Sequence, residues 1–468
     1  MSDITSSDRP RTGSHDRSVS TDLARFMTER WAPTPLPPDA RVAARDLTPA
    51  RRARLSARFP GERLVVPAGE LKVRSHDVDH RFRPHSAYAW LTGLTGEDQA
   101  GHVLVLEPSG PHAHEAVLYL RPRSPRTARA DGGFDTAFFR DRRYGELWVG
   151  RRPDLAEAER MTGIRCADLD ELGGSLPPGR EPSADPELAA ALSELRLVKD
   201  AWEVEQLQLA VDHTAAGFED VVRSLPRALA HPRGERWVEG VFGLRARAEG
   251  NGLGYETIAA SGAHACVLHW TRNDGPLDPS ALLLLDAGVE TDTLYTADIT
   301  RTLPLSGRFS PVQRQVYELV LAAQEAGIAA LRPGARFRDF HEAAMRVIAE
   351  GLAEWGVLKD AEGDLHRRYT LCSSGHMLGL DVHDCAQARA DAYLDGVLEA
   401  GQVLTVEPGL YLQPDDLTLP PELRGIGIRI EDDLVVTSEG AHLMSSALPR
   451  TPDAVEEWMG ALMDAGAA

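Results

Sequence analysis

Residues 371–385 read LCSSGHMLGLDVHDC, and the rest of the chain is expected to be organised around this stretch. It contains two histidines seven residues apart, His376 and His383, in a run that is otherwise mostly apolar or small. Gly375 and Gly379 allow the backbone to come close to a neighbouring segment. A histidine in such surroundings is commonly a hydrogen-bonded core residue, so a functional role requires partner side chains from elsewhere in the sequence.

Four acidic residues lie at or near the ends of apolar, strand-like runs: Asp286 in LLLLDAG, Asp298 in TADITRT, Glu407 in LTVEPGLY and Glu431 in GIRIEDD. A carboxylate beside Leu, Val or Ile is costly to bury unless it is paired or coordinated. Each acid alone has a simpler explanation, because an acid at the end of a strand can cap a turn. Four such acids and a histidine in one domain favour a shared site.

The spacing of these acids is expected to bring them together in pairs. Asp286 and Asp298 flank the turn-forming residues GVETDT, so a hairpin would place both carboxylates on adjacent strands. Glu407 and Glu431 are expected to meet in the same way. Four crowded carboxylates repel one another, and cations remove that repulsion. One imidazole and four carboxylates suit Mn, Co, Fe or Zn, and bridging carboxylates are sufficient for two ions.

The composition is that of a folded protein with excess negative charge. The 468 residues are 43% hydrophobic and 26% charged, which is typical of globular domains. Asp and Glu number 71 against 51 Lys and Arg, which gives a formal net charge of -20. This balance argues against a nucleic-acid or anionic-membrane partner, because binding to phosphates depends on basic residues. Its simplest meaning is solubility.

The cysteines and the N-terminus indicate where the protein works. Cys166, Cys266, Cys372 and Cys385 form no CxxC pair and no disulfide pattern, which indicates a reducing compartment. The first twenty residues have mixed charges and no apolar core, so no secretory signal is predicted. No apolar run approaches about 18 residues, so no membrane span is predicted. We therefore expect a cytoplasmic protein.

The chain is expected to form a tail and two domains. Residues 1–40, rich in Ser, Asp, Arg and Pro, are predicted to be a flexible tail with a short helix at Leu23–Trp31. Residues 41–185 are typical of a mixed α/β domain, and a Gly- and Pro-rich stretch closes it. Its predicted elements are a helix within 41–59 and short strands within 61–69, 101–110, 115–123 and 145–153. His112 and His114, in a loop, are expected to be solvated.

The second predicted domain, residues 186–468, alternates helices with short strands. Helical periodicity is present in 186–224, 237–249, 311–331 and 340–358. Strands are expected in 268–274, 281–290, 294–305, 402–412 and 425–437.

In this order, the segments DAG, ADITRT, GHMLGLDVHD, TVEPGLY and GIRIEDD resemble those of the Xaa-Pro aminopeptidases, or aminopeptidases P, of the pita-bread metallopeptidases. The resemblance runs from about residue 60 to 455 and includes HRFRPHSAYAWLTGL in the first domain. It implies an α/β protein of the α+β type, in which an N-terminal mixed domain precedes a pita-bread domain with a curved antiparallel sheet. It also implies a homo-oligomer, either a dimer or a tetramer.

The resemblance implies five ligands for two divalent ions, usually Mn: Asp286, Asp298, His376, Glu407 and Glu431. Asp298 and Glu431 would bridge the ions. Two cations lower the pKa of a bridging water, so hydroxide would be present near neutral pH to attack the scissile carbonyl. Glu407 could carry the proton, since a carboxylate that touches both metal and water can act as a ligand and as a proton carrier.

Further catalytic and substrate-binding residues are expected around the metals. His269 in VLHWT and His383 match the family's substrate-site histidines and are candidates to stabilise the oxyanion. Arg429 lies two residues before Glu431, on the same strand face, where it could hold a carboxylate. Tyr411 in EPGLY is similarly placed.

The substrates implied are peptides with proline in the second position. A prolidase that cleaves only dipeptides is an alternative, but the match of the first domain and of GIGIRIEDD favours an aminopeptidase. A non-catalytic binding protein on this fold, or a creatinase-like hydrolase, is less favoured because all five ligand positions are filled. Trp148 could line the site of a neighbouring subunit, although a tryptophan beside apolar strands is more often part of the core.

One position departs from the family pattern. Aminopeptidases of this type typically have a histidine four residues before the histidine ligand, where it lines the proline side of the site. The corresponding residue here is Cys372. A thiol is a weaker hydrogen-bond donor and cannot carry an imidazolium charge. We expect the metal centre to be unaffected and the proline preference or rate to differ.

Overall fold

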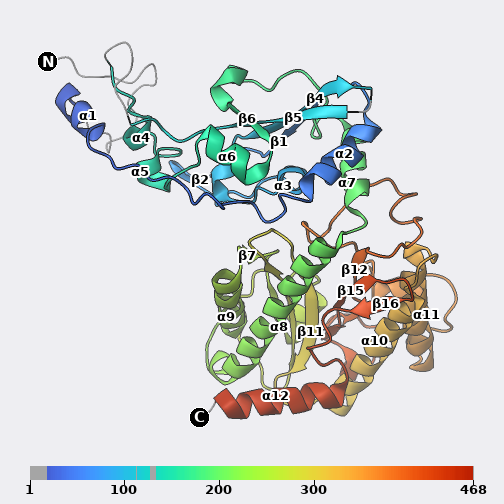
Figure 1. The fold of residues 1–468 in the computed structure, drawn as a ribbon. Helices are drawn as coiled ribbons and strands as arrows, with labels where there is room; N and C mark the ends of the chain where they lie inside the picture. Colours follow the sequence, from blue (N-terminus) through green and yellow to red (C-terminus); the bar gives the residue numbers. More distant parts are fainter. Residues whose placement is uncertain (1–17, 112, 127–132, 467–468) are drawn as a thin grey trace. The chain divides into compact units, whose positions relative to one another are not determined.

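The computed structural model describes residues 18–111, 113–126 and 133–466, and the chain divides into two compact units, Met1–Leu188 and Ala189–Ala468 (Figure 1). Within the described ranges, no helix has both the length and the apolar character that crossing a membrane requires.

The first unit is built on a mixed four-stranded sheet. The sheet contains β1 (Leu64–Pro67), β4 (Val103–Gly110), β5 (Ala113–Leu120) and β6 (Arg165–Asp168), and a separate two-stranded sheet contains β2 (Val73–Ser75) and β3 (Val78–Asp79). The helices of this unit are α1 (Thr21–Met27), α2 (Thr48–Arg58), α3 (Ser86–Thr92), α4 (Ala137–Arg140), α5 (Glu146–Val149) and α6 (Leu155–Thr162), with 3-10 turns at Glu97–Gln99 and Leu169–Leu172. The sheet order is β1-β4-β5-β6, and only β5 and β6 pair in parallel. Val65, Val103 and Val105 form a buried cluster on it, which is why these apolar runs form strands.

The strand expected within 145–153 is wrong. Residues Glu146–Val149 form the short helix α5, which ends at Gly150 with φ 92°. Trp148 is 54% exposed, and its indole N–H donates to the Phe139 carbonyl oxygen at 2.8 Å. Trp148 is therefore not a core residue, because this apolar run lies at the surface instead of pairing in the sheet.

The described part of residues 1–40 contacts the first unit. Helix α1 is capped by the Ser20 side chain, and the Trp31 ring meets the Phe138 ring edge-on at 5.2 Å. His114, predicted to lie in a loop, is on strand β5, and its Nε2 lies 2.7 Å from the Glu62 carbonyl oxygen. His112 lies outside the described residues.

The second unit contains the longest helices and the strands that carry the candidate site. Helix α7 (Pro186–Arg196) leads into it, followed by α8 (Ala201–Leu229), α9 (Gly234–Glu249), α10 (Pro311–Ala330), α11 (Phe337–Glu354) and α12 (Pro452–Gly466). Its strands are β7 (Gly252–Leu253), β8 (Ile258–Ser261), β9 (Leu282–Ala287), β10 (Val289–Glu290), β11 (Ile299–Pro304), β12 (Val403–Val406), β13 (Gly409–Leu412), β14 (Ile426–Arg429), β15 (Asp432–Val436) and β16 (Ala441–Leu443). Three 3-10 turns lie at Gly262–Cys266, Leu365–Arg368 and Pro421–Leu423.

Helix boundaries follow capping residues. The periodic run 186–224 forms two helices instead of one, because Asp200 caps α8 and forms a capping box with Glu203. Ser310 caps α10 in the same way, with Pro311 in the first turn, where a missing N–H costs nothing.

Short antiparallel strands from both halves of the second unit come together. Strands β8, β9 and β11 form one sheet with β9 in the middle, β12, β15 and β16 form another around β15, and β13 pairs with β14. The Glu431 N–H donates to the Thr300 carbonyl oxygen at 3.1 Å, which joins the two halves. Helix α9 packs on β8, and α10 packs on β12 and β14 (Figure 1).

The hairpin predicted between Asp286 and Asp298 is confirmed. Strands β9 and β11 pair antiparallel, with Asp286 opposite Thr300. The strand expected at 268–274 is wrong, because these residues form a loop of bends and turns.

A buried arginine fastens this hairpin to the other half of the unit. Arg301 on β11 is 1% exposed, and its guanidinium donates to the Asp432 carboxylate at 2.7 Å. It also donates to the carbonyl oxygens of Glu431, Leu448 and Pro449. These bonds satisfy both buried charges and fix the backbone beside Glu431.

Replacing Arg301 by leucine should destabilise the second unit by roughly 3–5 kcal/mol, because the Asp432 charge would be left buried with less compensation. The measurement is urea unfolding followed by circular dichroism. Arg308→Leu is the matched control, since that side chain is 84% exposed in its pair with Glu456 and should change the midpoint little. Equal midpoints for both variants would contradict the prediction.

Candidate metal centre

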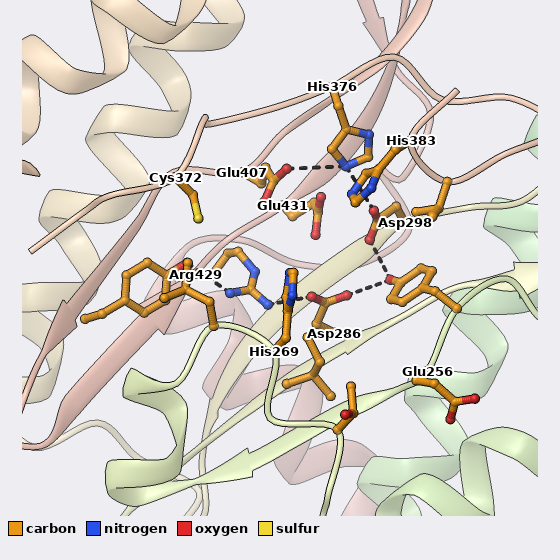
Figure 2. Close-up of a pocket in the computed structure, with 16 residues that line it drawn as sticks. Glu256, His269, Asp286, Asp298, Cys372, His376, His383, Glu407, Arg429 and Glu431 are labelled. Atoms are coloured by element: carbon orange, nitrogen blue, oxygen red, sulfur yellow. Dashed lines mark hydrogen bonds and ion pairs between the residues drawn. The ribbon is translucent and has the colours of Figure 1, made fainter. Parts of the chain in front are cut away.

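All ten residues singled out from the sequence line one cavity of the second unit, with a volume of about 370 Å³ (Figure 2). They are Asp286, Asp298, His376, Glu407, Glu431, His269, His383, Arg429, Tyr411 and Cys372. Residues that the sequence did not single out also line it, among them Tyr255 and Glu256.

The acids lie where short strands begin or end. Asp286 is on β9, and Asp298 immediately precedes β11, its antiparallel partner. Glu407 lies in the turn between β12 and β13, and Glu431 lies between β14 and β15. Both pairs therefore come from antiparallel pairing, which directs their carboxylates to one place.

His376 reaches the acids because its segment runs beside β12. The Thr405 N–H donates to the His376 carbonyl oxygen at 2.9 Å, and the Glu407 N–H donates to that of Ser374 at 2.9 Å. At Gly375 a Cβ would lie 2.2 Å from the Thr405 carbonyl oxygen, so no larger residue fits without a shift of the backbone. The expected close approach at this glycine is confirmed.

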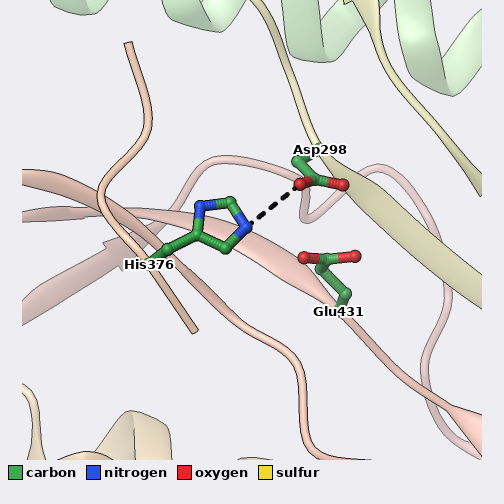
Figure 3. A group of neighbouring side chains, drawn as sticks. All are labelled: Asp298, His376 and Glu431. Atoms are coloured by element: carbon green, nitrogen blue, oxygen red, sulfur yellow. Dashed lines mark ion pairs between the residues drawn. The ribbon is translucent and has the colours of Figure 1, made fainter. Parts of the chain in front are cut away.

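Three of the side chains form a compact cluster. The His376 Nε2 lies 3.3 Å from an Asp298 oxygen and 3.4 Å from a Glu407 oxygen. Asp298, His376 and Glu431 each offer a ligand atom within 4.8 Å of the others (Figure 3). One nitrogen and several oxygen donors converging at this distance fit a divalent transition metal.

Burial and mutual repulsion perturb the acids. Burial, with the neighbouring carboxylates, raises the pKa of Glu431 well above its usual value, and burial raises that of Glu407 to about 7. Burial opposes the charge of His376, but its hydrogen bond to Asp298 and the nearby acids outweigh this and raise its pKa to about 9. The protein's own side chains do not balance the negative charge of these acids, and bound cations would do so.

Tyr255 was not foreseen, yet its hydroxyl lies between two of the acids. The oxygen is 2.6 Å from an Asp286 oxygen and 2.5 Å from an Asp298 oxygen. One hydroxyl proton cannot serve two carboxylates at once. Its sequence context, GYETIAAS, carries no pattern that separates it from an ordinary tyrosine before a strand.

Arg429 binds Asp286 on the side opposite to Tyr255. Its guanidinium donates to the Asp286 carboxylate, to the Tyr411 hydroxyl at 2.9 Å and to the Thr300 hydroxyl at 3.1 Å. The Thr300 hydroxyl in turn donates to Glu431 at 2.7 Å. Arg429 thus fixes one acid directly and a second through Thr300.

The two further histidines lie beside the cluster. The ring of His383 meets that of His376 edge-on at 4.5 Å, and burial together with the charge of His376 lowers its pKa. A neutral His383 can donate a hydrogen bond from one ring nitrogen. His269 lines the cavity beside Asp286 (Figure 2). Partial burial and Glu407 raise the pKa of Cys372, which keeps it a thiol.

Comparison with family models identifies the two units. Residues 205–438 match metallopeptidase family M24, and residues 49–181 match the aminopeptidase P N-terminal domain. The chain belongs to metallopeptidase family M24. It is accordingly a peptidase hydrolase with the predicted α+β fold, in which the second unit is the pita-bread domain, and its family uses divalent metal ions.

Known relatives agree over nearly the whole length. Xaa-Pro aminopeptidase 1 of Streptomyces coelicolor is 54% identical over 470 residues, covering 95% of this chain and 93% of that protein. Xaa-Pro aminopeptidase of Escherichia coli is 30% identical and covers 89% and 98%. Among solved structures, Pseudomonas aeruginosa aminopeptidase PepP has a TM-score of 0.74 at 30% identity and covers 92% and 99%.

One buried carboxylate in this M24 domain anchors the loop that carries His269. Glu235, in the first turn of α9, is 0% exposed. It accepts hydrogen bonds at 2.8, 2.7, 2.7 and 2.9 Å from the N–H groups of Ser261 and Gly275, the His264 ring and the Trp270 indole. The His264 ring also stacks on the Trp270 ring, with centroids 3.8 Å apart. Glu235 therefore acts as a positioning residue, and no sequence pattern identified it.

Glu235→Gln should lower kcat/KM by about tenfold or more, because an amide nitrogen would face donors that need an acceptor and the His269 loop would shift. Bound metal should be unchanged, since no ligand is touched. The measurements are kinetics and metal content at a temperature where the variant is folded.

Glu157→Gln is the matched control for this test. Glu157, in the first unit, also accepts bonds from backbone N–H groups and from an arginine, so its loss should cost comparable stability. It should leave kcat/KM intact. Equal loss of kcat/KM in both folded variants would show that Glu235 acts through stability alone.

Proposed function

We propose that the chain is an aminopeptidase that releases the first residue of peptides with proline in the second position, using two divalent ions, most favourably Mn. The observation that carries the proposal is the convergence of four carboxylates and His376 in one cavity, without enough positive charge from the protein to balance them. The names of the Streptomyces coelicolor and Escherichia coli relatives support the choice of substrate.

Asp286, Asp298, His376, Glu407 and Glu431 would hold the ions, because all five side chains line the same cavity. The ions, when bound, would lower the pKa of a water between them so that hydroxide is the nucleophile near neutral pH. Co, Fe and Zn suit the same donors.

Glu407 is the proposed proton carrier. Its side chain is 18% exposed and faces the cavity beside His376, so it can meet both water and the departing proline nitrogen. A peptide nitrogen is a poor leaving group as an anion, so a proton must be supplied for proline to leave as a neutral amine.

The other residues would orient the substrate. His269 and His383 would donate hydrogen bonds to the carbonyl oxygen as it gains negative charge. Arg429 would keep Asp286 and Tyr411 in place. Cys372 would lie on the proline side. A homo-oligomeric assembly and a cytoplasmic location remain predictions.

The test of this function is a panel of Xaa-Pro dipeptides and longer Xaa-Pro peptides, assayed with Mn for the wild type and for Glu407→Gln. We expect both lengths to be cleaved, and we expect kcat to fall by about 100-fold or more in the variant, because the amide cannot carry the proton. Cleavage restricted to dipeptides would indicate a prolidase instead. Undiminished turnover by Glu407→Gln would remove this residue as the proton carrier.

Cys372→His should change KM or the preference at the proline side more than it changes metal content, because the thiol lines the cavity without belonging to the ligand cluster. Kinetics with proline and alanine in the second position, together with metal analysis, provide the measurement. Cys372→Ser is the size-matched control. Unchanged kinetics in the histidine variant would mean that the departure from the family pattern is neutral.

A further inference from the structure

One carboxylate in the cavity has no part in the proposed chemistry. Glu256 follows Tyr255 directly and lines the same cavity. Its side chain is exposed, and within the described part of the chain it has neither a hydrogen bond nor a salt bridge. An acid at the mouth of a binding cavity without a partner in the protein is available to a ligand.

The position of Glu256 relates it to one end of the substrate. Figure 2 shows Glu256 and Cys372 on opposite sides of the ligand side chains, with the Glu256 carboxylate directed away from the ligands, where only a long side chain would reach it. The scissile bond must lie at the ligands, and Cys372 is assigned to the proline side. The end at Glu256 is therefore left for the side chain of the first residue.

The residues that line this cavity favour a particular kind of substrate side chain. Its aliphatic lining residues are Ile258, Leu268 and Val382. Ile258 lies two residues after Glu256, so in an extended chain the two side chains project to the same side. An apolar side chain such as Ile258 beside a carboxylate matches lysine or arginine, whose stems are apolar and whose ends are charged.

No cation of the protein competes for this carboxylate. Among the described residues that line the cavity, Arg429 is the only lysine or arginine. Its guanidinium is held by Asp286, Tyr411 and Thr300 on the far side of the metal ligands. Glu256 therefore keeps its negative charge available.

We propose that Glu256 is a specificity residue that pairs with the side chain of a first-position arginine or lysine, so that peptides beginning with a basic residue before proline are preferred. This inference rests on the proposed function and names a substrate class for it.

The test compares Arg-Pro-Ala with citrulline-Pro-Ala on the full chain supplied with Mn. Citrulline has the length and shape of arginine without its charge. We expect kcat/KM for the arginine peptide to be about threefold to tenfold higher, the range of a partly exposed charge-assisted pair. The ratio should decrease as NaCl screens the pair.

Variants of Glu256 show whether this residue causes the difference in kcat/KM between the two peptides. In Glu256→Gln the ratio should fall towards one, and in Glu256→Lys it should fall below one. Glu205→Gln is the matched control, because Glu205 is exposed on α8 and does not line this cavity, and it should keep the wild-type ratio.

The outcomes separate this inference from the function on which it rests. Cleavage of both peptides with equal kcat/KM by the wild type would overturn the inference and leave the proposed function intact. Equal loss for both peptides in Glu256→Gln would also overturn it, because the carboxylate would then hold the α-ammonium that both peptides share. Cleavage of neither peptide would overturn the proposed function, and the inference with it.

Discussion

The mutual repulsion of buried carboxylates around one cavity is the constraint on which the candidate site depends. Asp286, Asp298 and Glu431 are each less than a tenth exposed, and burial makes their charges costly. The protein supplies Arg429, the Thr300 hydroxyl and the Tyr255 hydroxyl as partners. These donors orient the carboxylates but do not balance all of their negative charge. The cavity is therefore more favourable with a bound cation than without one.

The surrounding structure keeps these unfavourable neighbours in place. The strands are short and antiparallel, so each returns an acid to the same cavity after a few residues. Arg301 joins the hairpin of Asp286 and Asp298 to the backbone of Glu431. Glu235 holds an irregular loop in place, and with it His269. The positions of the site residues thus depend on buried polar side chains as much as on the apolar core.

Much of the site could be predicted from the sequence because its residues lie in short, distinctive segments. An acid after a run of four leucines is visible without a structure, and the twelve residues from Asp286 to Asp298 suit a hairpin. Tyr255 and Glu235 could not be found in this way. Their partners are defined only in three dimensions, and a tyrosine before a strand or a glutamate in a first helical turn has many ordinary roles.

The errors in the fold have a related physical cause. The runs at 145–149 and 268–274 combine apolar and β-favouring residues, yet neither has a neighbouring strand with which to pair. Strand formation depends on partners that are remote in sequence, and four apolar residues do not determine whether such a partner is present. The acid-bearing strands were predicted correctly because each has an antiparallel partner in the described structure.

The division of the proposed ligands between two strand pairs would give a bound metal a mechanical role. Asp286 and Asp298 belong to β9 and β11, whereas Glu407 and Glu431 belong to the strands from β12 to β15. An ion bound by both sets would add a cross-link between two halves of the domain that Arg301, the Arg429–Asp286 pair and backbone hydrogen bonds already join. Because it binds only when the halves are joined, it stabilises the fold by RT ln(1 + [M]/Kd), about 2.7 kcal/mol when the ion is at 100 times its Kd. The domain's resistance to heat and proteolysis would then increase with the concentration of free metal around it.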